Sequence, residues 1–201
     1  MMCRGNSRLG ESAKVRPFVG GVLLTSTICL WLIVGMTTLP EITTEPQHAR
    51  LTSGLWSLRD VFVLPRPRDE VFDFFKEARN LETLTPDFLK FKVLTPDPIA
   101  IEEGTLIDYR LRLHGFPMGW RSEIIDWDPP HAFVDQQLKG PYQKWHHLHR
   151  FYEIPGGTLC EDEVTYKVLG GALIRRLFVV NDLDRIFRYR RETLNRLFPS
   201  Q

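Results

Sequence analysis

The sequence has little net charge and none of the short motifs that mark the common catalytic and nucleotide-binding sites. Its 201 residues include 26 Lys and Arg against 25 Asp and Glu, a formal net charge of +1. That balance leaves no overall field to attract nucleic acid, so we expect no nucleic-acid partner. No G-x-S-x-G sequence, glycine-rich phosphate loop or cysteine–histidine nucleophile pair is present. Motifs therefore name no catalytic residue, and we expect no cofactor.

Cysteine is also scarce. The three cysteines, Cys3, Cys29 and Cys160, lie far apart in the chain, and Cys29 falls within an apolar run. A disulfide framework is therefore not expected. Without a C-x-x-C pair or a Cys–His cluster, the sequence also gives no sign of a structural zinc site.

A long uncharged segment stands near the N-terminus. Phe18–Met36 is apolar or small throughout, and as a helix its 19 residues would span about 28 Å, close to the hydrocarbon thickness of a bilayer. The tail before it, residues 1–16, carries four basic residues and one acidic residue. The positive-inside rule then predicts an N-terminal apolar helix at residues 17–38 that anchors the chain in a membrane, with the following domain on the non-cytoplasmic side.

Two alternatives to an anchor remain open. The segment could be a cleaved signal peptide, although Ile33-Val34-Gly35 is a poor cleavage site because no A-x-A pattern is present. Met36 could instead be the true start, which would leave a cytoplasmic protein. Residues 39–54, which are polar and show no periodicity, are expected to form a linker.

From residue 55 to residue 198 the pattern is that of one folded α+β domain. Alternating apolar residues separated by Pro and Gly turns are typical of an antiparallel meander. A curved sheet of this kind needs a cover for its concave face, and the apolar stripe of the final helix supplies one. We expect a ligand cavity between the two. The pattern predicts strands at 56–64, 89–94, 104–113, 120–127, 131–138, 144–153 and 158–168, and helices at 68–78, 81–84 and 172–197.

The strand at 144–153 is the most informative element. Alternation places Trp145, His147, His149 and Phe151 on one face. Such a face could line a cavity, pack a core, or chelate a metal through its two imidazoles. A metal would need a carboxylate from a neighbouring strand, and Glu123 and Asp135 are both candidates for it. Because no fixed spacing marks such a set, we expect packing or ligand contact and no metal.

Large apolar and aromatic side chains on the inner faces are the candidates for the cavity wall, since aromatics give large contact areas and their polar atoms can fix a ligand. We expect the arginines of the final helix to be solvated, with contact to anionic lipid headgroups as the alternative. The expected wall residues are Tyr109, Leu111, Trp120, Trp145, His147, His149, Phe151, Leu177, Val180 and Phe187.

Several segments, in this order, resemble the SRPBCC superfamily, which has the START, polyketide-cyclase and birch-pollen-allergen type of helix-grip fold. The likeness is strongest to its bacterial cyclase/dehydrase-like branch and covers Trp56–Phe198. It implies a hydrophobic cavity between the sheet and the long helix, and it implies no single function. The segments are Pro65–Phe75, Trp127–Pro130, Phe133–Gln137, Gly140–Tyr142, Trp145–Phe151 and Arg185–Arg190.

Three functions are compatible with these observations. The favoured one is the binding, and by extension the transfer, of a hydrophobic small molecule or lipid. The second is a cyclase, dehydratase or hydrolase that uses His147, His149, Glu123 or Tyr109 as acid or base. The third is a membrane-tethered adaptor with a collapsed cavity.

Overall fold

The computed structural model describes residues 38–52 and 54–200. The apolar helix expected at residues 17–38 lies outside this range except for its last residue. Among the described residues, no helix combines the length and the apolar character needed to cross a membrane.

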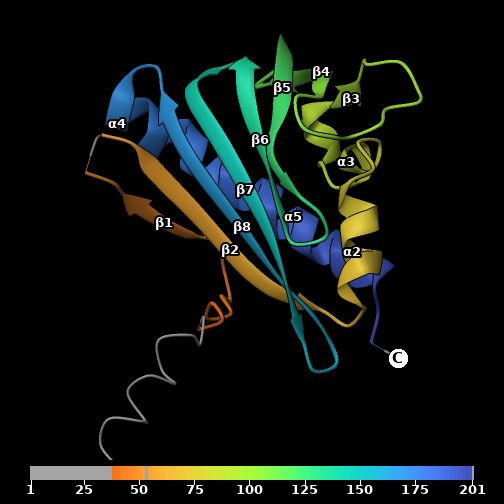
Figure 1. Cartoon of the computed structure of the whole chain (residues 1–201). Coiled ribbons are helices and arrows are strands. Elements are labelled where there is room, and N and C mark those ends of the chain that lie inside the picture. The colour runs from red at the N-terminus through yellow and green to blue at the C-terminus, as the bar shows by residue number, and fades with distance from the viewer. Residues whose placement is uncertain (1–37, 53, 201) are drawn as a thin grey trace, which may run out of the picture. The chain divides into compact units, whose positions relative to one another are not determined.

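An antiparallel sheet forms most of the domain, and it curves around the long helix at the end of the chain (Figure 1). Each strand pairs only antiparallel, in the spatial order β1-β2-β8-β7-β6-β5-β4-β3. The α+β helix-grip fold expected for residues 55–198 is therefore confirmed. The strands are β1 Gln47–Arg50, β2 Trp56–Leu64, β3 Lys92–Val93, β4 Leu106–Leu113, β5 Phe116–Asp128, β6 Ala132–Lys139, β7 Tyr142–Ile154 and β8 Gly157–Val168.

Two short helices follow β2: α2 (Arg68–Phe75) and α3 (Asn80–Thr83). Pro67 precedes the first turn of α2, and acidic residues in that turn complement the helix dipole. The helix buries Val71 and Phe72 against the sheet. The turn η1 (Asp87–Leu89) comes next, and Lys90 has a φ of 45°. These two features reduce the strand expected at 89–94 to the two residues of β3.

The final helix is built from three parts: α4 (Gly171–Ile174), the π-helical turn η2 (Arg175–Val179) and α5 (Val180–Leu197). Leu183, Phe187 and Leu194 of α5 are buried, whereas Leu173 and Leu177 are 66% and 54% exposed. A π turn inserts one extra residue, which rotates the following face by about 100°. The apolar stripe expected along the whole helix therefore covers the sheet only from α5 onward.

The segment expected to be a linker, 39–54, contains the edge strand β1. Its residues pair with Trp56–Arg59 of β2, although they show no apolar alternation. The pairing satisfies the exposed edge of β2, so the backbone rather than the side chains specifies this strand. Sequence periodicity could not reveal it for that reason.

The concave side buries charged groups as well as a hydrophobic core. Asp60, His147, His149 and Asp162 from the sheet are at most 5% exposed, and Arg190 from α5 is 7% exposed. Charged residues are almost never this deeply buried unless they are paired. The concave side is therefore the candidate location of a functional site.

Candidate functional site

Strand register assembles a cluster of two histidines and two aspartates on the concave face. Asp135 of β6 lies directly opposite His147 of β7. Asp162 of β8 lies directly opposite His149 on the other side of β7. Because His147 and His149 are two residues apart on one strand, both rings project to the same face. Arg190 reaches the cluster from α5.

Each imidazole in this cluster stands between the two carboxylates. His147 Nε2 and His149 Nδ1 lie 3.2 and 2.7 Å from Asp162 Oδ1. His147 Nδ1 and His149 Nε2 lie 3.4 and 3.5 Å from Asp135 Oδ2. Arg190 Nη1 lies 3.5 Å from Asp162 Oδ2. The contacts to Asp135 and from Arg190 are longer than ordinary hydrogen bonds.

The electrostatics of the cluster favour ionised carboxylates. Burial would raise the pKa of Asp135, but the attraction of the neighbouring His147 and His149 rings outweighs it and holds that pKa well below its usual range. The same balance places the pKa of Asp162 well below its usual range. Burial would lower the pKa of His149, yet the charges of Asp162 and Asp135 raise it. The two carboxylates therefore stay ionised and stabilise positive charge on His149.

A cavity of about 120 Å³ lies beside this cluster, between α5 and the inner faces of β4 to β7. A second lobe of about 60 Å³ extends toward α2. The two lobes share Leu81, Tyr109, Asp135 and Arg190 in their walls. The polar cluster therefore lies where the two lobes meet, and the rest of the larger lobe is mostly apolar and aromatic.

Most of the expected wall residues do line this space. Tyr109, Leu111, Trp120, Trp145, His147 and Phe187 border the larger lobe, and His149 borders the smaller one. Trp145 and Trp120 pack edge to face, with ring centroids 5.3 Å apart. Burial raises the pKa of Tyr109, so its phenol stays protonated and serves as a hydrogen-bond donor rather than a base.

Three expected wall residues lie elsewhere. Phe151 is buried in the core, where it packs against Phe72 and Phe75 of α2 with ring centroids 5.5 and 5.0 Å apart. Leu177 is exposed and Val180 is half-buried, and neither borders either lobe. The π turn at Arg175–Val179 explains both of these differences, because it turns this part of the helix away from the sheet.

Asp162 and Arg190 belong to the cluster, although the sequence pattern did not predict either of them as a site residue. Asp162 interrupts an otherwise apolar alternation, since Cys160, Val164 and Tyr166 share its face. That interruption was an available signal for a buried functional carboxylate. Arg190 was expected to be solvated with the other arginines of the helix, and its burial corrects that expectation.

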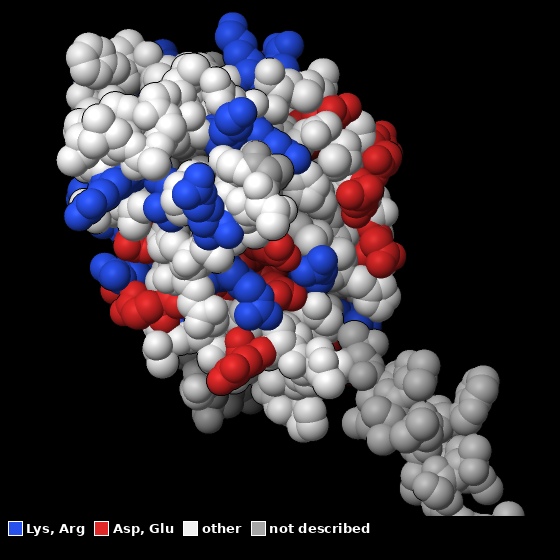
Figure 2. Space-filling view, turned by 90° about the vertical axis from the view of Figure 1, so that its left-hand side faces the viewer, with Lys and Arg blue, Asp and Glu red and all other residues white. Residues whose placement is uncertain are grey.

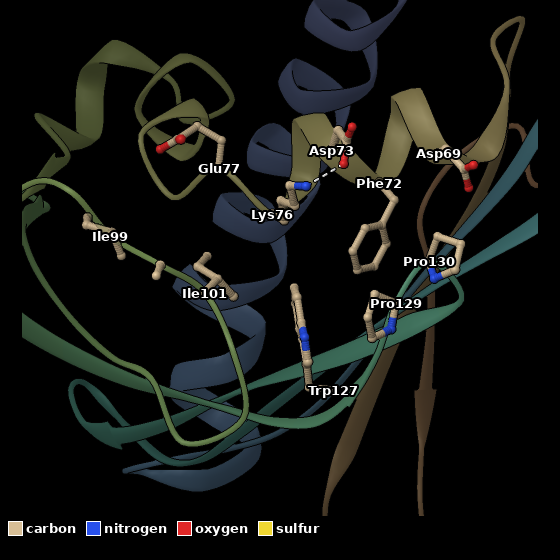
Figure 3. A pocket seen from close by; sticks show the side chains of 11 residues that line it. Asp69, Phe72, Asp73, Lys76, Glu77, Ile99, Ile101, Trp127, Pro129 and Pro130 are labelled. Atoms are coloured by element: carbon tan, nitrogen blue, oxygen red, sulfur yellow. Dashed lines mark ion pairs between the residues drawn. The ribbon is translucent and has the colours of Figure 1, made fainter.

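A second hollow, of about 740 Å³, is a groove on the outside of α2. Figure 3 shows the rings of Phe72 and Trp127 next to each other in its wall, with centroids 5.3 Å apart, while Asp69, Asp73 and Lys76 line its α2 side. The charged side chains on that side are exposed, and the Asp73–Lys76 ion pair satisfies two of them. The groove is larger than the inner cavity, but the described residues that line it include no buried polar group that could orient a ligand.

Solved structures with the same fold place the protein among the helix-grip domains. Protein TTHA0849 from Thermus thermophilus is 17% identical, with a TM-score of 0.54, over 69% of this chain and 96% of that chain. Ginseng major latex-like protein 151 from Panax ginseng is 10% identical, with a TM-score of 0.56, over 73% and 99%. The di-domain ARO/CYC BexL of the BE-7585A biosynthetic pathway is 20% identical, with a TM-score of 0.55, over 73% and 51%. At these identities the likeness concerns the fold alone.

The chain belongs to the polyketide cyclase / dehydrase and lipid transport family, whose model matches residues 64–185. This match confirms the resemblance to the SRPBCC superfamily. No curated protein matches the chain in sequence.

Proposed function

We propose that the protein binds a compact hydrophobic molecule with one polar group in the cavity between the sheet and α5. The observation that carries this proposal is an inner space whose walls are mostly apolar and which a few buried polar groups border. Leu111, Trp145 and Phe187 offer apolar contact, and His147 with Asp135 offers the polar contact. Sites that bind small molecules commonly have this composition.

The volume limits the ligand. A space of about 120 Å³ is close to the roughly 150 Å³ apolar cavity that accommodates benzene. It is smaller than the roughly 300–1,000 Å³ typical of drug-sized ligands. The occupant that fits is therefore a single-ring compound or the end of an acyl chain.

The test compares two tryptophan substitutions on one helix. Ile186→Trp fills the larger lobe, whereas Leu197→Trp adds the same bulk at an exposed position of α5. Calorimetric titration of the full chain with phenol, p-cresol and octanoate should give saturable binding to the wild type and to Leu197→Trp. Binding should be lost in Ile186→Trp. If the wild type binds none of the probes and releases no apolar compound on solvent extraction, the proposal is wrong.

A second function, catalysis in the same cavity, is favoured by the two imidazoles at its wall. Cyclisation or dehydration of a polyketide-like substrate needs a base and an acid near one carbon chain, and paired imidazoles can serve both roles. His147→Gln should then abolish turnover of a synthetic poly-β-ketone, and His146→Gln, on the opposite face of β7, should not. Equal turnover in both variants, or none in the wild type, would leave binding as the function.

Transfer would require contact with a membrane, and the start of the final helix offers a surface for it. Leu169, Leu173, Leu177 and Phe178 are all exposed, next to Arg175 and Arg176. This side of the molecule carries Lys and Arg among uncharged residues in its upper part, with Asp and Glu gathered at the right-hand edge and below (Figure 2). Apolar side chains flanked by arginine suit an interface of anionic lipid. Leu173→Asp should weaken sedimentation with phosphatidylserine vesicles, and Leu138→Asp, exposed on β6, should not.

We also infer, from the sequence alone, attachment through residues 17–38 with the domain on the non-cytoplasmic side. Carbonate-resistant membrane fractionation of the full chain, against a chain that starts at Met36, tests it. Equal release of both chains would contradict the anchor.

The adaptor function is disfavoured, because side chains do not fill the cavity.

A further inference from the structure

We propose that His147, His149 and Asp135 form a binding site for one divalent transition-metal ion of the zinc type, at the junction of the two cavity lobes. One donor atom from each of the three residues lies within 4.8 Å of the other two. This inference goes beyond ligand binding, because it adds an inorganic component to the cavity.

The spacing of the donor atoms supports a metal better than it supports direct hydrogen bonds. Asp135 Oδ2 lies 3.4 Å from His147 Nδ1 and 3.5 Å from His149 Nε2. These separations exceed the roughly 2.7–3.2 Å of good N–H···O bonds. Ligands placed about 2.0–2.2 Å from a tetrahedral zinc ion are themselves about 3.3–3.6 Å apart. Asp135 Oδ2 is therefore spaced from each imidazole nitrogen as one ligand is from its neighbour around a single ion, and the two nitrogens lie within 4.8 Å of each other.

An outer carboxylate completes the arrangement. The ring nitrogens that face away from Asp135 lie close to Asp162 Oδ1: His147 Nε2 forms a hydrogen bond with it at 3.2 Å, and His149 Nδ1 lies 2.7 Å from it without hydrogen-bond geometry. Metal-binding histidines generally donate their other N–H to such a carboxylate, which fixes the tautomer and points a lone pair at the ion. Arg190, 3.5 Å from Asp162 Oδ2, offsets the charge of this outer carboxylate.

The three proposed ligands also differ in burial, since the two histidines are buried and the aspartate is partly exposed. The side chains of His147 and His149 are 3% and 6% exposed, and that of Asp135 is 22% exposed. Phe133 stacks on the His149 ring at a centroid distance of 4.4 Å and holds its orientation. Because Asp135 borders both lobes, a fourth coordination position would open toward the cavity. Three protein ligands and one open position are the pattern of catalytic rather than structural metal sites.

The donor set selects the class of ion. Two imidazoles and one carboxylate suit Zn²⁺ and related first-row ions, whereas Ca²⁺ and Mg²⁺ prefer a shell of oxygen atoms. The strands also provide a matched control. Glu123, the other carboxylate that could have joined the histidines, instead accepts a hydrogen bond from Gln136 Nε2 at 2.9 Å.

The test uses the full chain, purified with an affinity tag that contains no histidine and stripped with a chelator. Zn²⁺ and Co²⁺ should each bind at one ion per chain, and Mg²⁺ should not compete. The Co²⁺ form should show the intense visible absorption of a four- or five-coordinate site. Asp135→Asn and His149→Gln should each weaken Zn²⁺ binding by more than the roughly 10–100-fold that loss of an outer-shell partner costs. Asp162→Asn should fall within that range, and Glu123→Gln should leave affinity unchanged.

Two outcomes would overturn the proposal: no stoichiometric ion on the wild type, or undiminished binding in both Asp135→Asn and His149→Gln. Should a variant fail to fold, the imidazole nitrogen resonances of the wild type give the answer, since Zn²⁺ must shift those of His147 and His149. Binding of p-cresol or octanoate by the chelated protein is measured separately. If the protein binds the organic probes but no metal ion, the metal site is rejected and the proposed function stands. If it binds the metal ion but none of the organic probes, the proposed function is rejected and the metal site stands.

Discussion

Two groups of buried charges lie under α5, and they differ in how completely their polar atoms are hydrogen-bonded. In the first, Arg191 binds Asp60, which is 1% exposed, and donates from Nη1 to the carbonyl of Thr43 at 2.7 Å. In the second, adjacent Arg190 lies 3.5 Å from Asp162, and its Nε has no hydrogen-bond partner among the described residues. Two consecutive arginines of one helix thus serve a closed ion pair and an open cluster.

The difference indicates a structural role for one group and a functional role for the other. Asp60 and Asp162 are directly paired across β2 and β8, so location within the sheet does not explain it. The Asp60 group satisfies its donors and acceptors internally, as buried polar groups in stable cores do. The Asp162 cluster borders a cavity and leaves contacts long, as expected where a ligand or ion supplies the missing interactions.

The largest effect should come from breaking the closed pair. Arg191→Leu leaves the Asp60 carboxylate buried without its partner, and we expect the free energy of unfolding to fall by about 3–5 kcal/mol. Urea denaturation measures it. The double variant with Asp60→Val should recover most of the loss, since no unpaired charge remains. A double variant as unstable as the single one would show that Arg191 acts through packing instead.

A smaller loss of unfolding free energy is expected on substitution of Thr43, whose hydroxyl accepts a hydrogen bond from the backbone N–H of Val61 at 2.9 Å. Thr43→Val leaves that buried N–H without its acceptor and should cost about 1–3 kcal/mol. Thr44→Val, at the exposed neighbouring position, should change stability by less than about 0.5 kcal/mol. Equal effects at the two positions would contradict a role of the Thr43 hydroxyl in closing the pair.

In the open cluster, we expect a substitution to affect ligand or metal binding more than it affects stability. Asp135→Asn should lower the unfolding free energy of the metal-free, ligand-free protein by clearly less than Arg191→Leu does, because the Asp135 side chain is 22% exposed and its contacts to His147 and His149 are long. The same denaturation experiment checks it. A loss as large as that of Arg191→Leu would mean that the cluster is structural and would remove the contrast between the two groups.

The smallest effect is expected at the surface, where Arg121 donates twice to Asp108 at 2.8 Å. This pair lowers the pKa of Asp108, so its contribution is present above the carboxyl's ordinary pKa and is lost as pH falls through the lowered value. Arg121→Ala should raise the Asp108 pKa toward about 3.9, as followed by NMR titration, with no measurable change in the unfolding midpoint. An unchanged Asp108 pKa would show that the pair does not persist in solution.

Local patterns predicted much of the fold. Alternation correctly placed His147 and His149 together on the inner face of β7, and it placed Tyr109 and Leu111 on that of β4. The side-chain pattern failed where backbone hydrogen bonds determine the local structure. It gave no sign of β1, which pairs through backbone groups, or of the π turn that displaces Leu177 from the cavity.

The sequence by itself determined the strand faces, the covering helix and the family, because side-chain periodicity and turn residues act over short stretches of chain. Only the tertiary structure decided which charges meet. Glu123 and Asp135 were equal candidates in sequence, and strand register brought Asp135 to the histidines and Glu123 to Gln136. Likewise, the direction in which α5 crosses the sheet sent Arg190 to Asp162 and Arg191 to Asp60. Register and helix placement are set by packing across the whole domain, so the chemistry of the site depends on contacts between residues far apart in the chain.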